Sequence, residues 1–275
     1  MNANLTEHEL RQLRDAMLGE IEARPPTIGL IGVSGVGKSS TINALFKTDL
    51  KTSDTVACTK EFENVDLDLK ITSGDIKGSD TKLRIVDAPG LGEDMEKDPE
   101  YMKEYKEKLR KCDVILWVQA ARNRAVAMDQ RYLTELSEFH SKIVFGLNQI
   151  DMVEPLGWDE KTQRPIGWNE SLNIPSEEQE ENIGKILADR KEKMAKIVRR
   201  NVPFIAFTSR KGYGLQELFT TILLNMPKER IWIFDGLKNF KPEDFLSERA
   251  KKILQQDFPR RKSLMNRLFS FTNKH

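Results

Sequence analysis

A glycine-rich segment near the amino terminus carries the residue types that bind phosphate. Residues 32–39 read Gly-Val-Ser-Gly-Val-Gly-Lys-Ser and fit the pattern G-x-x-x-x-G-K-[ST]. The segment follows the apolar run 27–31 and precedes a stretch with helical spacing, 40–46. Backbone N–H groups of such a loop converge on phosphate oxygens, and the helix dipole strengthens the attraction. We therefore predict phosphate contacts from Ser34, Gly35, Val36, Gly37, Lys38, Ser39 and Ser40.

Four side chains or backbone groups have distinct expected roles in handling a nucleoside triphosphate. Lys38 should reach the β- and γ-phosphates, and Ser39 should offer its hydroxyl to Mg²⁺. Asp87 ends the apolar run 83–86, and a carboxylate there can hold the water shell of the metal ion. Gly90 follows three residues later and leaves a backbone N–H for the γ-phosphate. The expected cofactor is therefore Mg²⁺.

A second motif indicates which base the nucleotide carries. Residues 148–151 read Asn-Gln-Ile-Asp and directly follow the apolar run 142–147. The carboxylate of Asp151 can accept hydrogen bonds from N1–H and N2–H₂ of guanine. Adenine offers neither donor, and a buried acceptor left unpaired disfavours binding strongly. The motif therefore favours GTP and GDP over ATP and ADP.

These motifs, in this order, resemble those of a TRAFAC-class GTPase with an Era-like G domain. Residues 32–46 are especially similar to the bacterial YfjP-type GTPases, often named 50S-ribosome-binding GTPase-like. The resemblance covers about residues 25–226 and implies a protein that hydrolyses GTP to GDP and phosphate. It places Asn148, Gln149 and Asp151 around the base. It also identifies residues 208–210 as the last base-contacting loop, with Arg210 in it and the Ser209 N–H against guanine O6.

The resemblance also implies an effector-loop threonine that closes over Mg²⁺ and the γ-phosphate. Thr59 stands just before an alternating strand pattern, which is its usual position in the family, and Thr55 is the alternative. With Thr59, the expected metal ligands are Ser39, Thr59 and Asp87. The expected catalytic groups are Lys38, Thr59 and Gly90.

Two departures from the family pattern affect the expected activity. Gln149 stands where the family usually has Lys, so it can cover the base but brings no charge. Leu91 follows Gly90 where Ras-type proteins carry the water-orienting Gln. The resemblance therefore implies slow hydrolysis that a partner or a nucleotide-dependent homodimer accelerates, since relatives sharing G-x-[ST]-G-x-G-K-S-S often meet across their nucleotide faces. The alternative is a nucleotide-dependent assembly or interaction module with negligible turnover.

The order of apolar runs and amphipathic stretches predicts an α/β fold. Strands are expected near 27–33, 61–70, 81–87, 113–118, 142–147 and 202–207. Helices are expected near 38–47, 98–111, 124–139, 178–200 and 214–225. Such alternation implies a mostly parallel sheet with helices on both faces, the three-layer P-loop GTPase fold. Nucleotide then binds at the carboxyl ends of the strands, where the motif loops fall.

Composition and charge divide the chain into three expected parts. A helix over 1–24 precedes the G domain, 25–226, and a basic extension follows over 227–275. The chain has 275 residues with 39% hydrophobic and 32% charged, as in soluble globular proteins. The sequence shows no spanning apolar run and no secretion signal, and its two cysteines lack metal spacing, so a cytoplasmic location is expected.

Two segments leave their roles open at the level of sequence. Residues 152–177 are long for a loop and contain two Gly-Trp pairs, so they form either a partner surface or a loop packed on its own domain. The extension holds twelve Lys or Arg against six Asp or Glu. It could contact ribosome, RNA or an anionic membrane, or pack on the G domain through Leu264, Leu268 and Phe271.

Overall fold

The apolar runs form the strands of one central sheet. The structure, a computed structural model, describes residues 22–46, 48, 50, 62–70, 80–92, 98–123, 126–161 and 164–227, together with residues 12, 15, 16, 19 and 20. The strands are β1 (Thr27–Ile31), β2 (Glu63–Lys70), β3 (Asp80–Asp87), β4 (Val114–Ala120), β5 (Ile143–Asn148) and β10 (Phe204–Ala206). β1, β4 and β5 are buried along their whole length, as expected for parallel strands covered on both faces.

The sheet has the order β10-β5-β4-β1-β3-β2. Neighbouring strands run parallel except β2 and β3, which pair antiparallel with Glu63 opposite Asp87. The predicted mostly parallel sheet is thus confirmed. Because β1, β3, β4, β5 and β10 run the same way, the loops that follow them emerge at one edge.

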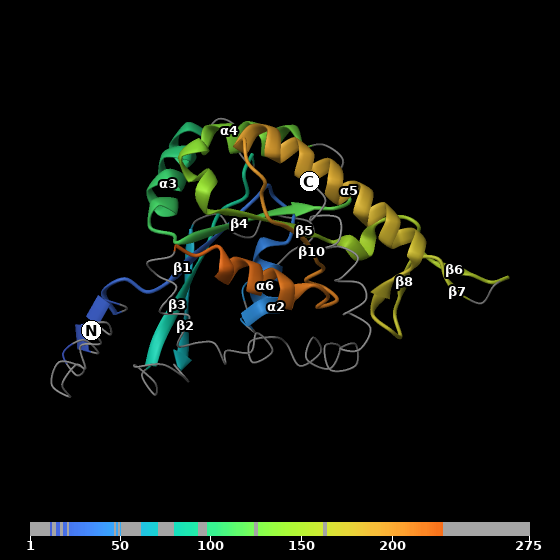
Figure 1. Ribbon diagram of the computed structural model, residues 1–275, viewed down its shortest axis with the longest axis horizontal. Coiled ribbons are helices and arrows are strands. Elements are labelled where there is room, and N and C mark those ends of the chain that lie inside the picture. Colours follow the sequence, from blue (N-terminus) through green and yellow to red (C-terminus); the bar gives the residue numbers. More distant parts are fainter. Residues whose placement is uncertain are drawn as a thin grey trace, which may run out of the picture.

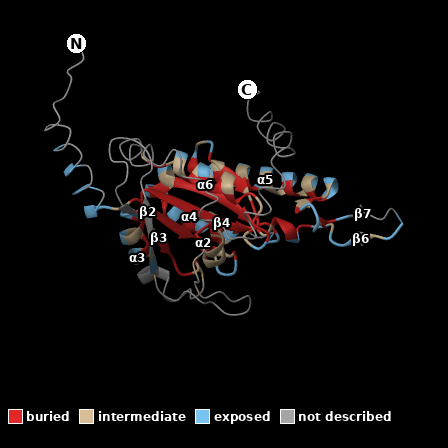
Figure 2. Cartoon of the chain, turned by 90° about the horizontal axis from the view of Figure 1, so that it is seen from below, coloured by how far each residue is buried: buried red, intermediate tan, exposed pale blue. Residues whose placement is uncertain are grey.

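Helices cover both faces of the sheet, which confirms the predicted three layers (Figure 1). α2 (Lys38–Phe46) and α6 (Leu215–Leu224) pack on one face, and α3 (Asp98–Arg110), α4 (Ala127–Glu135) and α5 (Glu177–Val198) on the other. Two apolar layers result, one on each side of the sheet. The buried strands lie between helices whose outer faces are exposed (Figure 2).

The helix predicted over 124–139 is shorter in the structure. α4 ends at Glu135, and a 3₁₀ helix, η1 (Ser137–Lys142), leads into β5. Side chains three residues apart lie on one face of a 3₁₀ turn. Leu136 and Phe139 can therefore both enter the core, where they are 0% and 3% exposed. Both side chains are thus buried although α4 ends before them.

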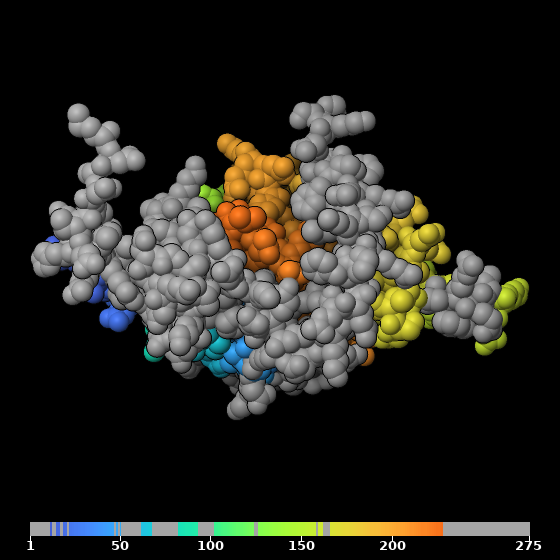
Figure 3. Space-filling model, turned by 60° about the horizontal axis from the view of Figure 1, so that its bottom comes forward, coloured from blue at the N-terminus to red at the C-terminus, as the bar shows by residue number. Residues whose placement is uncertain are grey.

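Residues 152–177 form small structured units at one end of the molecule (Figures 1 and 3). A 3₁₀ turn, η2 (Ile150–Met152), precedes two antiparallel pairs: β6 (Trp158–Asp159) with β7 (Arg164–Pro165), and β8 (Trp168–Asn169) with β9 (Ile174–Pro175). The amide of Gln179 on α5 donates to the carbonyl of Val153 at 2.7 Å, and Asn182 donates to that of Glu154 at 2.9 Å. These contacts confirm that the segment packs on its own domain.

Several predictions lie outside the described residues. Most of the helix predicted within 1–24, the threonines at 55 and 59, and residues 228–275 of the basic extension are in this group. Among the described residues, no helix is long and apolar enough to cross a membrane.

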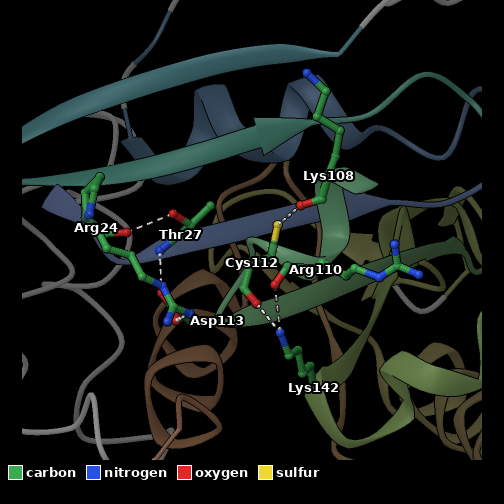
Figure 4. A network of polar contacts seen from close by, with 8 residues as sticks. Arg24, Thr27, Lys108, Arg110, Cys112, Asp113 and Lys142 are labelled. Carbon is green, nitrogen blue, oxygen red and sulfur yellow. Dashed lines mark hydrogen bonds and ion pairs between the residues drawn. The ribbon is translucent and has the colours of Figure 1, made fainter. Parts of the chain in front are cut away.

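A polar network fixes the amino-terminal edge of the sheet (Figure 4). The buried carboxylate of Asp113, at the start of β4, accepts from the Thr27 N–H at 2.9 Å and from the Arg24 guanidinium at 3.0 Å. The Lys142 ammonium donates to the Cys112 carbonyl at 2.7 Å. Burial raises the pKa of the Cys112 thiol to about 12. This network joins the ends of β1, β4 and β5 opposite the edge that carries the motif loops.

Replacing Asp113 should destabilise the fold. Asp113→Ala leaves the buried Thr27 N–H without its acceptor, so we expect a loss of about 1–3 kcal/mol in the free energy of unfolding. Asp66→Ala is the matched control, because Asp66 also pairs with an arginine, Arg84, but on the exposed surface of β2 and β3. It should cost less than about 1 kcal/mol. Urea denaturation measures both, and equal losses would show that the Asp113 network is not a structural anchor.

Candidate nucleotide-binding site

The predicted motifs converge at the carboxyl edge of the sheet. The glycine loop follows β1, the segment 87–90 follows β3, and the two base-recognition segments follow β5 and β10. Because these strands are parallel members of one sheet, their carboxyl ends place segments far apart in sequence side by side.

The glycine loop has a backbone that requires glycine. Gly35 and Gly37 have φ angles of 76° and 89°, in the left-handed region. A Cβ on Gly37 would also lie 2.5 Å from Nδ2 of Asn148, so the loop passes the β5 segment with no room for a side chain. The following helix α2 begins at Lys38, so the first-turn N–H groups that a helix leaves without intrahelical partners stand at the end of the loop. This is the geometry expected of a phosphate cradle.

Lys38, Ser39 and Asp87 are brought together at the end of this loop. Nζ of Lys38 donates to the carbonyls of Gly32 at 3.2 Å and Val33 at 3.4 Å, so the ammonium lies along the loop. The Ser39 hydroxyl donates to Oδ2 of Asp87 at 2.6 Å, and Asp87 is only 1% exposed. A hydroxyl and a carboxylate in contact are hard oxygen ligands of the kind that Mg²⁺ prefers. The residues present therefore fit the expected metal.

Asn148 joins the phosphate loop to the base-recognition segments. Its Nδ2 donates to the Val36 carbonyl at 2.9 Å and to the Ser209 hydroxyl at 3.3 Å. Its Oδ1 accepts from the backbone N–H of Gln149 at 2.8 Å and of Ser209 at 3.0 Å. Asn148 is fully buried, so the loops after β1, β5 and β10 all depend on one amide.

The two residues expected to hold the base stand next to this amide. Gln149 adopts a left-handed conformation with φ 63°, and its Nε2 donates to the Gly35 carbonyl at 3.1 Å. The side chain thus lies against the phosphate loop, as expected for a residue that covers the ring. Asp151 is the middle residue of the 3₁₀ turn η2 and is 8% exposed. A carboxylate with this little exposure favours ligand donors over water.

The structure corrects the prediction for Ser209. Its backbone N–H donates to Oδ1 of Asn148, so this group is not left to meet guanine O6. The next N–H along the loop is that of Arg210. Nothing in the sequence signals this hydrogen bond, because Asn148 lies 61 residues from Ser209 in the chain.

Sequence reasoning missed Lys211 altogether. Lys211 is 8% exposed, and its ammonium contacts both carboxylate oxygens of Glu170 at 2.6 Å. The available signal was spacing: Ser209-Arg210-Lys211 matches S-A-K in its first and last residues.

Leu91 lies in the core and not in the site. Its side chain is 5% exposed and belongs to the apolar layer beneath α3, α4 and α5. Its N–H donates to the Gly32 carbonyl at 3.1 Å, and the hydroxyl of Tyr105 donates to the carbonyl of Pro89. The segment that includes Gly90 is therefore tied to both the phosphate loop and α3. No water-orienting side chain is supplied at the position of Leu91.

Comparisons with known proteins agree with this geometry. A family model described as 50S ribosome-binding GTPase matches residues 27–149. YfjP of Escherichia coli K12 is 30% identical over 207 residues, which are 74% of this chain and 63% of YfjP. YkfA of the same organism is 36% identical over 47% of this chain and 43% of its own length. GTPase Der of Buchnera aphidicola is 30% identical over 46% of this chain and 26% of its own.

The chain thus spans less than two thirds of the length of these relatives. Among solved structures, Era of Aquifex aeolicus superposes with a TM-score of 0.52 at 19% identity, covering 74% of this chain and 57% of Era. That likeness concerns the fold. Sequence motifs, site geometry and fold agree: residues 27–149 match the 50S ribosome-binding GTPase family model, the chain resembles YfjP in sequence, and it has the fold of Era.

Proposed function

We propose that this protein binds GTP and GDP with Mg²⁺ and hydrolyses GTP to GDP and phosphate, acting as a slow switch. The observation that carries the proposal is the Asn148 network, which joins a phosphate loop to a base pocket containing Asp151. A chance glycine turn would not share a buried amide with a base-recognition loop. The G domain of this proposal comprises residues 25–226, and a cytoplasmic location, where GTP is supplied, belongs to the same proposal.

In the phosphate half, the chain supplies charge and oriented dipoles. The N–H groups of residues 34–40 surround the β-phosphate, and Lys38 moves from the loop carbonyls to the β- and γ-oxygens. Ser39 and Asp87 would hold Mg²⁺, with Thr59 completing the set in the GTP state. When bound, the ion would supply positive charge that offsets the charge of the β- and γ-phosphates. The Gly90 N–H meets the γ-phosphate, so γ-phosphate loss releases the segment that begins at Asp87.

In the base half, the chain supplies selectivity. The Asp151 carboxylate accepts from N1–H and N2–H₂ of guanine, Gln149 covers the ring, and the Arg210 N–H donates to O6. Adenine would leave Asp151 unpaired in a site that excludes water. Adenine would also present an amine to the Arg210 N–H in place of O6. Each buried group without a partner costs about 1–3 kcal/mol, so the mismatches at Asp151 and at the Arg210 N–H together lower the affinity by roughly two orders of magnitude or more.

The burial of Leu91 supports slow intrinsic hydrolysis. In-line attack requires an oriented water, and the side chain at this position points into the apolar layer. We propose that a second subunit or an activating partner supplies the missing group. The same observation favours the second candidate function, an assembly module that binds nucleotide with negligible turnover. We also propose that the extension, 227–275, contacts ribosome, RNA or an anionic membrane. This part of the proposal rests on its excess of Lys and Arg over Asp and Glu.

Exchanging Asp151 for Asn should change the base preference. The amide of Asp151→Asn presents a donor where guanine also donates, whereas xanthine presents a carbonyl at that position. We expect the variant to lose affinity for GDP by roughly a hundredfold and to prefer xanthosine diphosphate. Competition against a fluorescent GDP analogue measures both affinities. Equal affinity of the unaltered protein for GDP and ADP would contradict guanine recognition.

Hydrolysis should depend on protein concentration or on a partner. A group supplied in trans can raise the rate by several orders of magnitude, so specific activity should increase as the protein associates. Single-turnover hydrolysis of GTP over a range of protein concentrations, with the molecular mass measured in the GDP and GTP states, provides the test. Fast hydrolysis by a monomer at a concentration-independent rate would exclude this mechanism. No turnover in any oligomeric state would favour the assembly module.

A further inference from the structure

The loop that reads the base is held from outside the nucleotide motifs. This loop, residues 208–213, contacts the β8–β9 pair of the 152–177 segment. Glu170 accepts both ammonium contacts from Lys211 at 2.6 Å. Nδ2 of Asn173 donates to the Lys211 carbonyl at 3.1 Å. The Trp168 ring meets that of Tyr213 edge to face, with centroids 5.4 Å apart.

These contacts form a connected and largely buried unit. The indole N–H of Trp168 donates to Oδ1 of Asn173 at 3.1 Å, so the Asn173 amide uses its oxygen within the segment and its nitrogen on the loop. Trp168, Asn173 and Lys211 are each no more than 8% exposed, whereas the Glu170 side chain is 69% exposed. A buried amide that is hydrogen-bonded at both its oxygen and its nitrogen fixes the segment relative to the loop, because losing either bond leaves an unpaired polar group.

The segment is itself anchored, so it can act as a support. The Ser176 hydroxyl caps α5 by accepting from the Gln179 N–H at 3.1 Å and donates to the Ile166 carbonyl at 2.8 Å. The Gln179 amide donates to the Val153 carbonyl at the start of the segment. Both ends of the segment are therefore fixed to the amino terminus of α5.

Arg210 lies between two fixed points of the loop. Ser209, on one side, is held by Asn148 of β5. Lys211, on the other side, is held by Glu170 and Asn173. The direction of the intervening N–H is consequently set by both, and only the Asn148 side belongs to a nucleotide motif.

We propose that Trp168, Glu170 and Asn173 form a clamp that positions the guanine-reading loop, so that the 152–177 segment sets affinity for guanine nucleotides. The inference rests on the proposed function, since it assumes that the loop reads guanine O6. Coupling between two sites is reciprocal, so bound guanine nucleotide in turn stabilises the clamp. The three residues are positioning residues and do not touch the nucleotide.

The clamp is tested by single substitutions that leave the nucleotide motifs intact. Glu170→Gln removes the charge that pairs with Lys211, and we expect GDP to dissociate roughly three- to tenfold faster. Asn173→Ala also leaves the Trp168 indole and the Lys211 carbonyl without partners, and we expect roughly a ten- to thirtyfold increase. Glu138→Gln is the control. Glu138 lies on η1, away from the nucleotide edge, and makes a surface ion pair with Arg110 of α3 that the substitution removes. It should leave dissociation unchanged.

A second ligand separates positioning from general loosening. 2-Aminopurine riboside diphosphate keeps the phosphates and the N2 amine of GDP but lacks O6 and the N1–H. Its overall affinity is therefore lower than that of GDP, and the comparison is between variant and wild type for each ligand separately. If the clamp directs the O6 contact, Glu170→Gln weakens GDP binding and leaves binding of this analogue at its wild-type value. Equal weakening of both ligands would show a merely structural role and overturn the proposal.

Hydrogen exchange gives a readout that does not depend on nucleotide affinity. Without nucleotide, amides of 208–213 should exchange faster in both clamp variants than in the wild type and the Glu138→Gln control. Adding GDP to the wild type should slow exchange at 168–173. Wild-type exchange at 208–213 together with wild-type GDP dissociation in both variants would overturn the clamp. A wild type that binds no guanine nucleotide would instead overturn the proposed function, and exchange at 208–213 would still decide whether the clamp holds the loop.

Discussion

One buried amide, that of Asn148, holds the nucleotide site together. It bonds the carbonyl of Val36 in the phosphate loop and two groups of Ser209 in the base loop, while its own neighbour Gln149 reaches back to Gly35. Each partner lies at the end of a different strand, so no local sequence preference could align them. A fully buried amide tolerates no alternative arrangement without leaving a polar group unpaired. The loop that follows β1 and the loop that follows β10 are therefore fixed relative to each other.

The sheet makes this junction possible. Parallel strands β1, β3, β5 and β10 end at one edge, and the apolar layers on both faces hold those ends in register. At the opposite edge, the buried carboxylate of Asp113 ties β1 to β4. The 152–177 segment adds a second support at the base loop. The base loop is thus held at Ser209 by Asn148 and at Lys211 by Glu170 and Asn173.

Sequence alone could predict those parts of the site in which chemistry and spacing coincide. The phosphate loop, Asp87 at a strand end and Asp151 after β5 are signalled by residue type next to an apolar run, and the structure brings Ser39 and Asp87 into contact. The clamp could not be predicted, because Glu170 is 41 residues from Lys211 in the chain and Glu170, Asn173 and Trp168 belong to no motif. The hydrogen bond from the Ser209 N–H to Asn148 could not be predicted for the same reason, since it is a tertiary contact.

The central claim is that Asn148 makes the phosphate and base halves one unit, and Asn148→Ala tests it most directly. The measurement is the affinity of this variant for GDP and for pyrophosphate, by displacement of a fluorescent nucleotide. The network predicts a loss of roughly ten- to a hundredfold for GDP, from about two buried hydrogen bonds. It also predicts a clear loss for pyrophosphate, because Val36 in the phosphate loop loses its brace although no base is present. Unchanged pyrophosphate affinity would contradict the claim and confine Asn148 to the base pocket.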